Sequence, residues 1–357
     1  MKILFLGDFL YDYDLINDDI IELSNYIKKN NLVTILNLEG AYKSKNKLKK
    51  SVNLACSNKL MEVLNLLNVI AVNLANNHIL DYGSEGLESL IKDLEKNKIN
   101  YFGAGVNLTK ALEPYILEFN KKKIAFFGFG WKMEESINAK KKKAGTAPLD
   151  FKLINKCINE CSVDYVIPTF HFGYEFEKLP QPLFVKKCRE LIKNKKVKAI
   201  IGHHPHVVEA YDKKYNIFYS LGNSYFGTMR KRYTKDFKHY PHVNQGIGVI
   251  FNLDNFQSEI INIISYDEIT KINNQEKILN LVDISNIDTV DYNDYFKKNN
   301  NMINKKFIYK NGFIYEKLIN KTHYLHRNSY KLYLRKVKWP LIKLIKKVLR
   351  KGNKNEK

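Results

Sequence analysis

Short apolar runs alternate with amphipathic stretches through about the first 225 residues of the 357-residue chain. This pattern is typical of strands that alternate with helices in an α/β domain. The expected strands are residues 3–6, 33–38, 69–73, 115–119, 124–129, 165–170, 199–201, 217–220 and 245–253. The expected helices are residues 18–29, 58–67, 84–97, 150–161 and 182–195. An apolar fraction of 45% is enough to bury a large core, so the sequence predicts a globular α/β protein.

The cysteines and the N-terminus limit the class of protein. The four cysteines are scattered and form no CxxC pair, which argues against a disulfide framework and against a structural zinc knuckle. The N-terminal apolar run stops at Asp8, so it is shorter than the core of an export signal and suits a buried strand better. No stretch reaches the about 20 apolar residues that a membrane span requires. We therefore expect a cytoplasmic protein.

Much of the positive charge lies near the C-terminus. The formal net charge is +22, and 13 lysines and arginines but no acidic residue lie between Glu316 and Glu356. After Pro340, aliphatic residues recur at helical spacing with cations on the other face, which predicts a basic amphipathic helix. Such a helix suits an anionic membrane surface and would hold the protein at the inner face of the plasma membrane. The alternatives are a solvated helix packed on the domain and a contact with nucleic acid, a partner that we do not expect.

Composition divides the chain into three segments. Residues 1–260 contain the alternating pattern, and we interpret them as one α/β domain. Residues 261–330 are rich in Asn, Lys, Asp and Ile with weak periodicity, which indicates an irregular linker or decoration. Residues 331–357 contain the basic amphipathic helix.

Polar residues follow several of the expected strands directly. These clusters are residues 7–8, 37–40, 76–78, 171–175 and 202–206, and they contain Asp, Glu, Asn and His. In open α/β sheets, ligands collect at the carboxyl ends of strands, so the five clusters can converge on one point. A mixture of oxygen and imidazole ligands suits a borderline divalent metal ion.

Each cluster has a simpler interpretation when it is taken alone. Asp8 can be a turn or helix-cap residue. Asn77 and His78 can form a capped turn, with Asp81 as a surface charge three residues later. His171 can be a hydrogen-bonded histidine of the core.

The acidic and histidine clusters together favour a metal site. Glu39 follows an apolar strand and is either exposed or a ligand, because burying it unpaired is costly. His203, His204 and His206 place three imidazoles within four residues beside a glycine, which packing rarely needs. A His-x-His spacing also places two rings on one side of an extended segment.

The ordered motifs resemble a known family. They are GD at 7–8, NLEG at 37–40, NLANNHILDYG at 73–83, GAG at 103–105, HFGYE at 171–175, GHHPHVVE at 202–209 and YSLGN at 219–223. Together they cover about residues 2–226 and are similar to the capsule-synthesis CapA family, also described as poly-γ-glutamate synthesis proteins. That family is a branch of the calcineurin-like metallophosphoesterase superfamily.

The resemblance implies a four-layer α/β/β/α sandwich with a metal site at the strand ends. The positions that match the expected metal ligands are Asp8, Glu39, Asn77, His171, His204 and His206. His78 matches the histidine that contacts the leaving group, and Asp81 would orient it. His203, Glu175 and Asn223 are expected in the substrate pocket.

One position departs from the superfamily pattern. A histidine usually follows the first Asp by two residues, and this chain has Leu10 there. One metal position therefore loses an imidazole, and we expect one or two divalent ions, manganese first, with iron or zinc as alternatives. Whether His203 or His204 is the first member of the final His-x-His pair stays open.

The resemblance implies a role in capsule, poly-γ-glutamate or surface polysaccharide synthesis. We expect a metal-dependent hydrolase that cleaves a phosphoester or a γ-glutamyl amide bond, with an anionic polymer or a phosphorylated molecule as substrate. The alternative is a non-catalytic assembly factor that binds an anionic polymer in the pocket while its C-terminal helix contacts the membrane.

Overall fold

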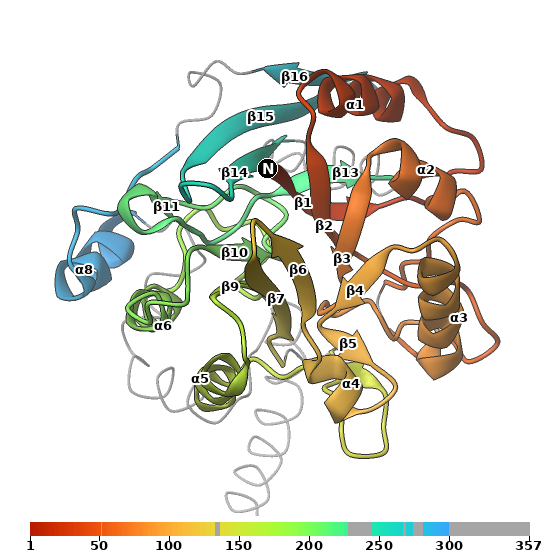
Figure 1. Cartoon of the computed structure of the whole chain (residues 1–357), viewed down its shortest axis with the longest axis horizontal. Coiled ribbons are helices and arrows are strands. Elements are labelled where there is room, and N and C mark those ends of the chain that lie inside the picture. The colour runs from red at the N-terminus through yellow and green to blue at the C-terminus, as the bar shows by residue number, and fades with distance from the viewer. Residues whose placement is uncertain (51, 133–135, 228–244, 267–268, 274–280, 300–357) are drawn as a thin grey trace, which may run out of the picture. The chain divides into compact units, whose positions relative to one another are not determined.

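Two β-sheets form the framework of the described part of the chain (Figure 1). The structure is a computed structural model that describes residues 1–50, 52–132, 136–227, 245–266, 269–273 and 281–299. The expected helix at 331–357 lies outside these residues, so its presence stays a prediction. None of the described helices has the length and apolar content needed to span a bilayer.

The first sheet has eight described strands arranged around β1 (Lys2–Leu10). Its order is β16 (Ile269–Asn273), β15 (Ser258–Tyr266), β14 (Gln245–Asn252), β1, β2 (Val33–Leu38), β3 (Val69–Asn73) and β4 (Asn100–Phe102). A further strand, β13 (Asn223–Phe226), also pairs with β1. Because β2 and β13 are both parallel to β1, three strands present their carboxyl ends together.

Three helices connect the parallel strands of this sheet and cover one of its faces. They are α1 (Asp18–Lys29), α2 (Leu60–Leu66) and α3 (Gly83–Lys96). Their buried residues, such as Leu23, Leu64 and Leu90, pack with Leu4 and Leu36 of the sheet in one apolar cluster. The helix expected to begin at Ser84 begins one residue earlier, and its N-cap position is Tyr82, whose side chain makes no capping hydrogen bond.

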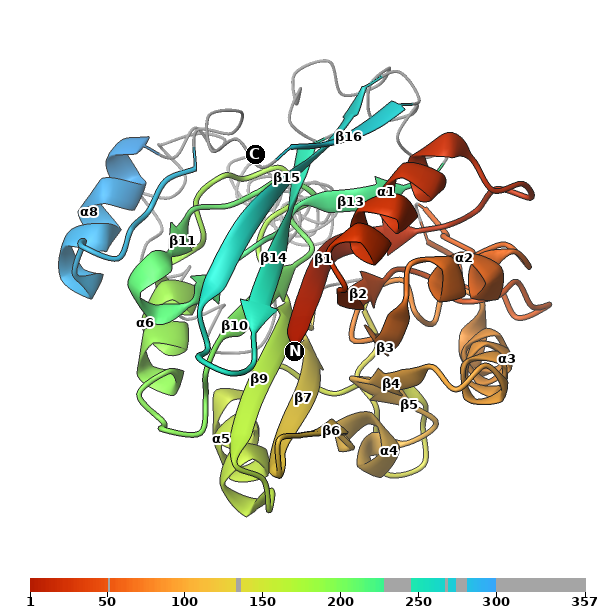
Figure 2. The ribbon, with the colours of Figure 1, turned by 45° about the horizontal axis from the view of Figure 1, so that its top comes forward.

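The second sheet has six described strands and its own outer helices (Figure 2). Its order is β11 (Tyr211–Asp212), β12 (Ile217–Phe218), β10 (Ile200–His203), β9 (Tyr165–His171), β7 (Lys122–Gly130) and β6 (Tyr115–Phe119). The helices α5 (Phe151–Glu160) and α6 (Pro182–Leu191) pack on it, with Phe151 against Phe170 and Phe184 against Phe172.

An apolar layer joins the two sheets face to face. Phe5 and Ile35 of the first sheet pack with Phe126, Ile167 and Ile201 of the second. The resulting order of layers is helix, sheet, sheet, helix. The predicted α/β/β/α sandwich is therefore confirmed.

Smaller elements lie beside the two sheets. They are the pair β5 (Ala104–Gly105) and β8 (Gly145–Thr146), the short helix α4 (Leu108–Leu112), the 3₁₀ turn η1 (Lys213–Tyr215) and α8 (Thr289–Asn299). The last of these belongs to the segment expected to be an irregular linker. In that segment the described residues also form the end of β15 and all of β16. The apolar periodicity of this segment is weak because α8 is mostly polar and buries mainly Tyr292 and Phe296.

Candidate metal centre

β1 brings Asp8 between two parallel neighbours. Asp8 pairs in register with Asn37 of β2 on one side and with Asn223 of β13 on the other. Its main-chain N–H donates to the carbonyl oxygen of Gly222 at 2.9 Å. The two strands approach this closely because Gly7 has no side chain, and a Cβ there would lie 2.0 Å from the same carbonyl oxygen. The glycine before Asp8 thus allows three strand ends to meet around a fully buried carboxylate.

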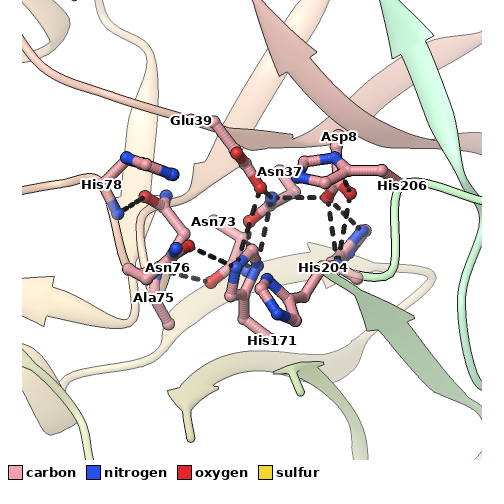
Figure 3. A network of polar contacts seen from close by, with 12 residues as sticks. Asp8, Asn37, Glu39, Asn73, Ala75, Asn76, His78, His171, His204 and His206 are labelled. Carbon is pink, nitrogen blue, oxygen red and sulfur yellow. Dashed lines mark hydrogen bonds and ion pairs between the residues drawn. The ribbon is translucent and has the colours of Figure 1, made fainter. Parts of the chain in front are cut away.

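Glu39 and His206 complete a buried group of three with Asp8. Glu39 follows β2, and its main-chain N–H donates to the carbonyl oxygen of Phe9 at 2.9 Å. His206 lies in the loop after β10, where His204 and His206 have φ values of 103° and 58°. Non-glycine residues rarely adopt positive φ, and such strain occurs most often at functional sites. One ligand atom from each of Asp8, Glu39 and His206 lies within 4.8 Å of the others, and Figure 3 shows the three side chains converging.

A chain of amides holds the two carboxylates. The Nδ2 of Asn37 donates to Oδ1 of Asp8 at 2.9 Å and to Oε1 of Glu39 at 3.3 Å. Its own Oδ1 accepts from Nδ2 of Asn73 at 2.9 Å, and Oδ1 of Asn73 accepts from the main-chain N–H of Ala75. Because a backbone N–H can only donate, this sequence of bonds orients both amides and directs the NH₂ of Asn37 at the acids.

The second sheet contacts this amide chain through Gly128 of β7. A Cβ on Gly128 would lie 2.1 Å from Oδ1 of Asn73, so only glycine leaves room for the amide. The amides that hold the acids are thus enclosed between the two sheets.

His171 and Asn77 lie beside the carboxylates. His171 ends β9, and its Nε2 lies 2.9 Å from Oδ1 of Asn77 and 3.7 Å from Oε1 of Glu39. Its ring centre is 4.8 Å from that of His204. Burial, and then the nearby imidazoles, lower the pKa of His171 well below its ordinary value. A neutral ring of this kind is the form that binds metal.

Both candidate histidines before Pro205 approach Asp8, but through different groups. His203 Nδ1 lies 3.8 Å from Oδ1 of Asp8, whereas the main-chain N–H of His204 donates to Oδ2 of Asp8 at 3.2 Å. Burial lowers the pKa of His203 to about 4, although the Asp8 charge opposes this shift. The choice between His203 and His204 as a ligand therefore stays open. Asn223 lies 2.9 Å, through Oδ1, from Nδ1 of His206.

Glu175 and Leu10, two other positions singled out by the motifs, lie in different surroundings. Glu175 is half-buried, and its charge contributes to raising the pKa of both Glu39 and His206. Leu10 is 1% exposed and belongs to the apolar cluster between the first sheet and its helices.

His78 and Asp81 form a pair at the start of the segment that leads to α3. Nδ1 of His78 lies 2.7 Å from Oδ2 of Asp81, which also accepts from the main-chain N–H of Leu54 at 2.8 Å. The other oxygen of Asp81 accepts from Nζ of Lys50 at 2.6 Å. Burial alone would raise the pKa of Asp81, but the hydrogen bond and charge of His78 and the charge of Lys50 lower it. The catalytic roles of His78 and Asp81 stay predictions.

The electrostatics of the three central groups are linked. Burial and then the Asp8 charge raise the pKa of Glu39 well above its ordinary value. Burial would lower the pKa of His206, but Glu39 and Asp8 raise it to about 10. Burial would raise the pKa of Asp8, but the hydrogen bond and charge of His206 hold it below the ordinary value. His206 and the two buried acids thus influence one another's charge.

This set of donors suits a divalent cation. Two carboxylates and one imidazole are within reach of one point, and all three are buried. Oε2 of Glu39 has no hydrogen-bond partner among the described residues. Burying an unpaired carboxylate oxygen is costly, and a cation would satisfy it.

Three residues of this network were not among the candidates from sequence. Asn37 and Asn73 lie inside quoted motifs, and their position at the ends of β2 and β3 is the signal that could have found them. Lys50 has no such signal, because lysines surround it from Lys43 to Lys49.

The comparison with protein families agrees with the geometry. The sequence model of the family described as bacterial capsule synthesis protein PGA_cap matches residues 2–228 of the chain. The chain belongs to this family. The match confirms the resemblance to the CapA family drawn from the motifs, and it includes Asp8, Glu39 and His206.

Two curated relatives are similar to this chain over about half of its length. The "capsule biosynthesis protein CapA" of Bacillus anthracis is 28% identical over 192 residues, which are 52% of this chain and 46% of the relative. The "PGA biosynthesis protein CapA" of Bacillus subtilis (strain 168) is 30% identical over 183 residues, 50% of this chain and 48% of the relative. The matched region spans about half the length of each relative. Among solved structures, a hypothetical protein from Thermus thermophilus is 15% identical with a TM-score of 0.42, and the alignment covers 76% of this chain and 97% of that one.

Proposed function

We propose that the chain is a metal-dependent hydrolase of capsule or poly-γ-glutamate synthesis that cleaves a phosphoester or a γ-glutamyl amide bond. The observation that carries this proposal is the buried group of Asp8, Glu39 and His206, whose ligand atoms lie within 4.8 Å of one another. The names of the two Bacillus relatives support the process.

The ion would be held first by Asp8, Glu39 and His206, with His171, Asn77 and His204 around them. The expected metal is manganese, with iron or zinc as alternatives, because the donors combine oxygen and nitrogen. A bound divalent ion supplies a Lewis acid and lowers the pKa of a bound water toward neutrality.

The chain's own residues would prepare the site and move the proton. Asn37 fixes the two carboxylates before any ion binds, since it donates to both. His78, held at Nδ1 by Asp81, would donate a proton to the leaving oxygen or nitrogen.

Charges beside the site favour an anionic substrate. The loop after Glu39 carries four exposed lysines: Lys43, Lys45, Lys47 and Lys49. None of the four forms an ion pair with another described residue, and no acidic residue lies between Glu39 and Glu62. This loop contacts the His78–Asp81 pair, as Leu48 N–H donates to the carbonyl oxygen of Asp81 at 2.8 Å. Unpaired cations at this position would attract an anionic polymer or a phosphorylated molecule.

Metal analysis and hydrolysis assays test the proposal together. We expect stoichiometric metal in protein purified without chelator, and manganese-dependent cleavage of generic phosphoesters or γ-glutamyl peptides. Asp8→Asn and His206→Ala should lower kcat/KM by more than about 100-fold, since changes behind the ligands alone cost about 10–100-fold. Exposed Lys140→Gln serves as a control and should match the wild type. The proposal is contradicted if the purified protein contains no metal and both variants have the same kcat/KM as the wild type.

A second candidate function follows from Leu10. A buried leucine stands where the superfamily has a histidine, so a site that binds one ion and an anionic polymer without cleaving it is the alternative. In that case the protein contains stoichiometric metal and retains polyglutamate, but releases no product over prolonged incubation. If the wild-type protein shows turnover and Asp8→Asn does not, the protein is a hydrolase.

A further inference from the structure

We propose that Lys50 is a positioning residue that ties the proton donor pair to the metal site, an inference that rests on the proposed function. Its Nζ donates to Oδ1 of Asp81 at 2.6 Å and to the main-chain carbonyl oxygen of Asn77 at 2.6 Å. Its side chain is 6% exposed, whereas Lys49 beside it is exposed.

Lys50 joins Asn77 and Asp81, which lie in one turn of the chain. Asn77 opens the turn, and its side-chain oxygen lies 2.9 Å from Nε2 of His171. Asp81 lies near the end of the turn, and its Oδ2 is 2.7 Å from Nδ1 of His78. A single ammonium group therefore fixes both the expected ligand and the residue that orients the expected acid.

Lys50 also compensates the negative charge of Asp81, in addition to its hydrogen bonds. Asp81 is 0% exposed, and its negative charge acts on Glu39. Without a cation, a third buried carboxylate would add to the charge of Asp8 and Glu39. Removing one partner of a buried ion pair leaves an uncompensated charge, which is more costly than the pair itself.

The loop that carries Lys50 keeps other anchors to the same turn. Leu48 N–H donates to the carbonyl oxygen of Asp81 at 2.8 Å, and Nδ2 of Asn53 donates to the same oxygen at 3.3 Å. Ser44 donates to the carbonyl oxygen of Tyr82. These bonds do not involve the Lys50 side chain, so we expect Lys50→Met to fold with the loop in place.

The test compares Lys50→Met with Lys49→Met, which removes an exposed charge one residue away. Lys50→Met should lower kcat on a generic phosphoester and weaken Mn²⁺ binding in calorimetry by about 10–100-fold, with a smaller change in KM. The downfield NMR signal of the His78 Nδ1 proton should shift or disappear. Lys50→Arg should recover part of each loss. Lys49→Met should match the wild type in Mn²⁺ affinity and in the NMR signal, and Lys140→Gln, an exposed lysine outside this loop, is the control for kcat.

A double-variant cycle separates positioning from general destabilisation. Once Asp81→Asn has removed the acid's charge, adding Lys50→Met should cost less than it does in the wild type. Equal and additive effects of the two changes, or a Lys50→Met protein that matches Lys49→Met in Mn²⁺ affinity and NMR signal, would overturn the role of Lys50. If the wild-type protein binds no Mn²⁺ and hydrolyses none of the substrates, the proposed function is wrong. The NMR comparison of Lys50→Met with the wild type still tests the role of Lys50 in that case.

Discussion

Glu209 is a buried carboxyl group close to the histidine loop but outside the group of candidate ligands. It is 2% exposed, and its Oε1 has no hydrogen-bond partner in the described part of the chain. Burial, and then the charge of Glu177, raise its pKa well above the ordinary value. The folded protein therefore keeps a proton on Glu209 at pH values where the unfolded chain has lost it.

This proton makes stability depend on pH in a defined direction. The contribution of Glu209 is fully present below its ordinary pKa of 4.5 and is lost as pH rises toward the folded pKa. Glu209→Gln removes this pH dependence. Above about pH 4.5, the free energy of unfolding of the variant should therefore rise relative to that of the wild type by up to about 1.4 kcal/mol per pH unit. Urea unfolding of both proteins between pH 4.5 and 8 measures the difference. A constant difference across that range would contradict the prediction.

At the residue scale, the sequence indicated the candidate ligands better than the groups that hold them. Asp8, Glu39 and His206 are recognisable because acidic and imidazole groups directly after apolar runs need a reason to be there. Asn37 is an ordinary polar residue until the pairing of β1 with β2 places it against Asp8. Lys50 acts on residues about 30 positions away, and only the folded loop shows which of the neighbouring lysines is buried.

An arginine of α6 helps to fix the segment that contains α8 to the second sheet. Arg189 of α6 binds both carboxylate oxygens of Asp212, at 3.0 and 2.7 Å. It also donates to the carbonyl oxygens of Ile284 and Ile287, just before α8. Tyr292 in α8 is fully buried and donates to the carbonyl oxygen of Pro180 at 2.8 Å.

Loss of this arginine should weaken the whole fold rather than only its end. Arg189→Met leaves the buried Asp212 carboxylate without its cation, which should lower the free energy of unfolding by about 3–5 kcal/mol. The neighbouring Lys187→Met breaks an exposed pair with Glu190 and should cost less than about 1 kcal/mol. Urea unfolding checks both variants. Similar losses for the two would show that the α8 segment does not depend on Arg189.

Elements with a continuous apolar pattern were predictable, whereas those stabilised by distant partners were not. β2 and β3 lie at the expected positions, and β1 contains its expected residues 3–6 but extends from Lys2 to Leu10, because nearly every residue in these strands is buried. β16 carries few apolar residues and is held by its antiparallel pairing with β15. α8 is also mostly polar, and the segment before it is held by Arg189 of α6, 98 positions earlier in the chain. The pairing of β13 with β1 joins residues more than 200 positions apart, and no local pattern predicts it.

At the scale of the whole molecule, the charge distribution leads to a prediction about membranes. We propose that the basic C-terminal segment binds anionic lipid, because 13 of the 22 net positive charges lie in it. Full-length protein should sediment with anionic vesicles at low salt, and changing Lys343, Lys346, Lys347, Arg350 and Lys351 to Gln should abolish this. Each cation near the surface contributes about 1 kcal/mol. Changing Lys140, Lys141, Lys142 and Lys143 to Gln removes a similar charge elsewhere and should have no effect. Equal sedimentation of all three proteins would exclude the tail as the contact.

The position of β1 also determines when the centre can come into existence. Gly7 bonds to Ser224, 217 residues further along the chain, and His204 follows Asp8 by 196 residues. At about 5–20 residues per second, a ribosome needs roughly 10–40 s to make that stretch. A nascent chain therefore carries its first carboxylate long before the imidazoles are synthesised. An ion that binds at this centre would therefore load only after the chain has been made through Ser224. It would then link the earliest and latest parts of the domain against unfolding.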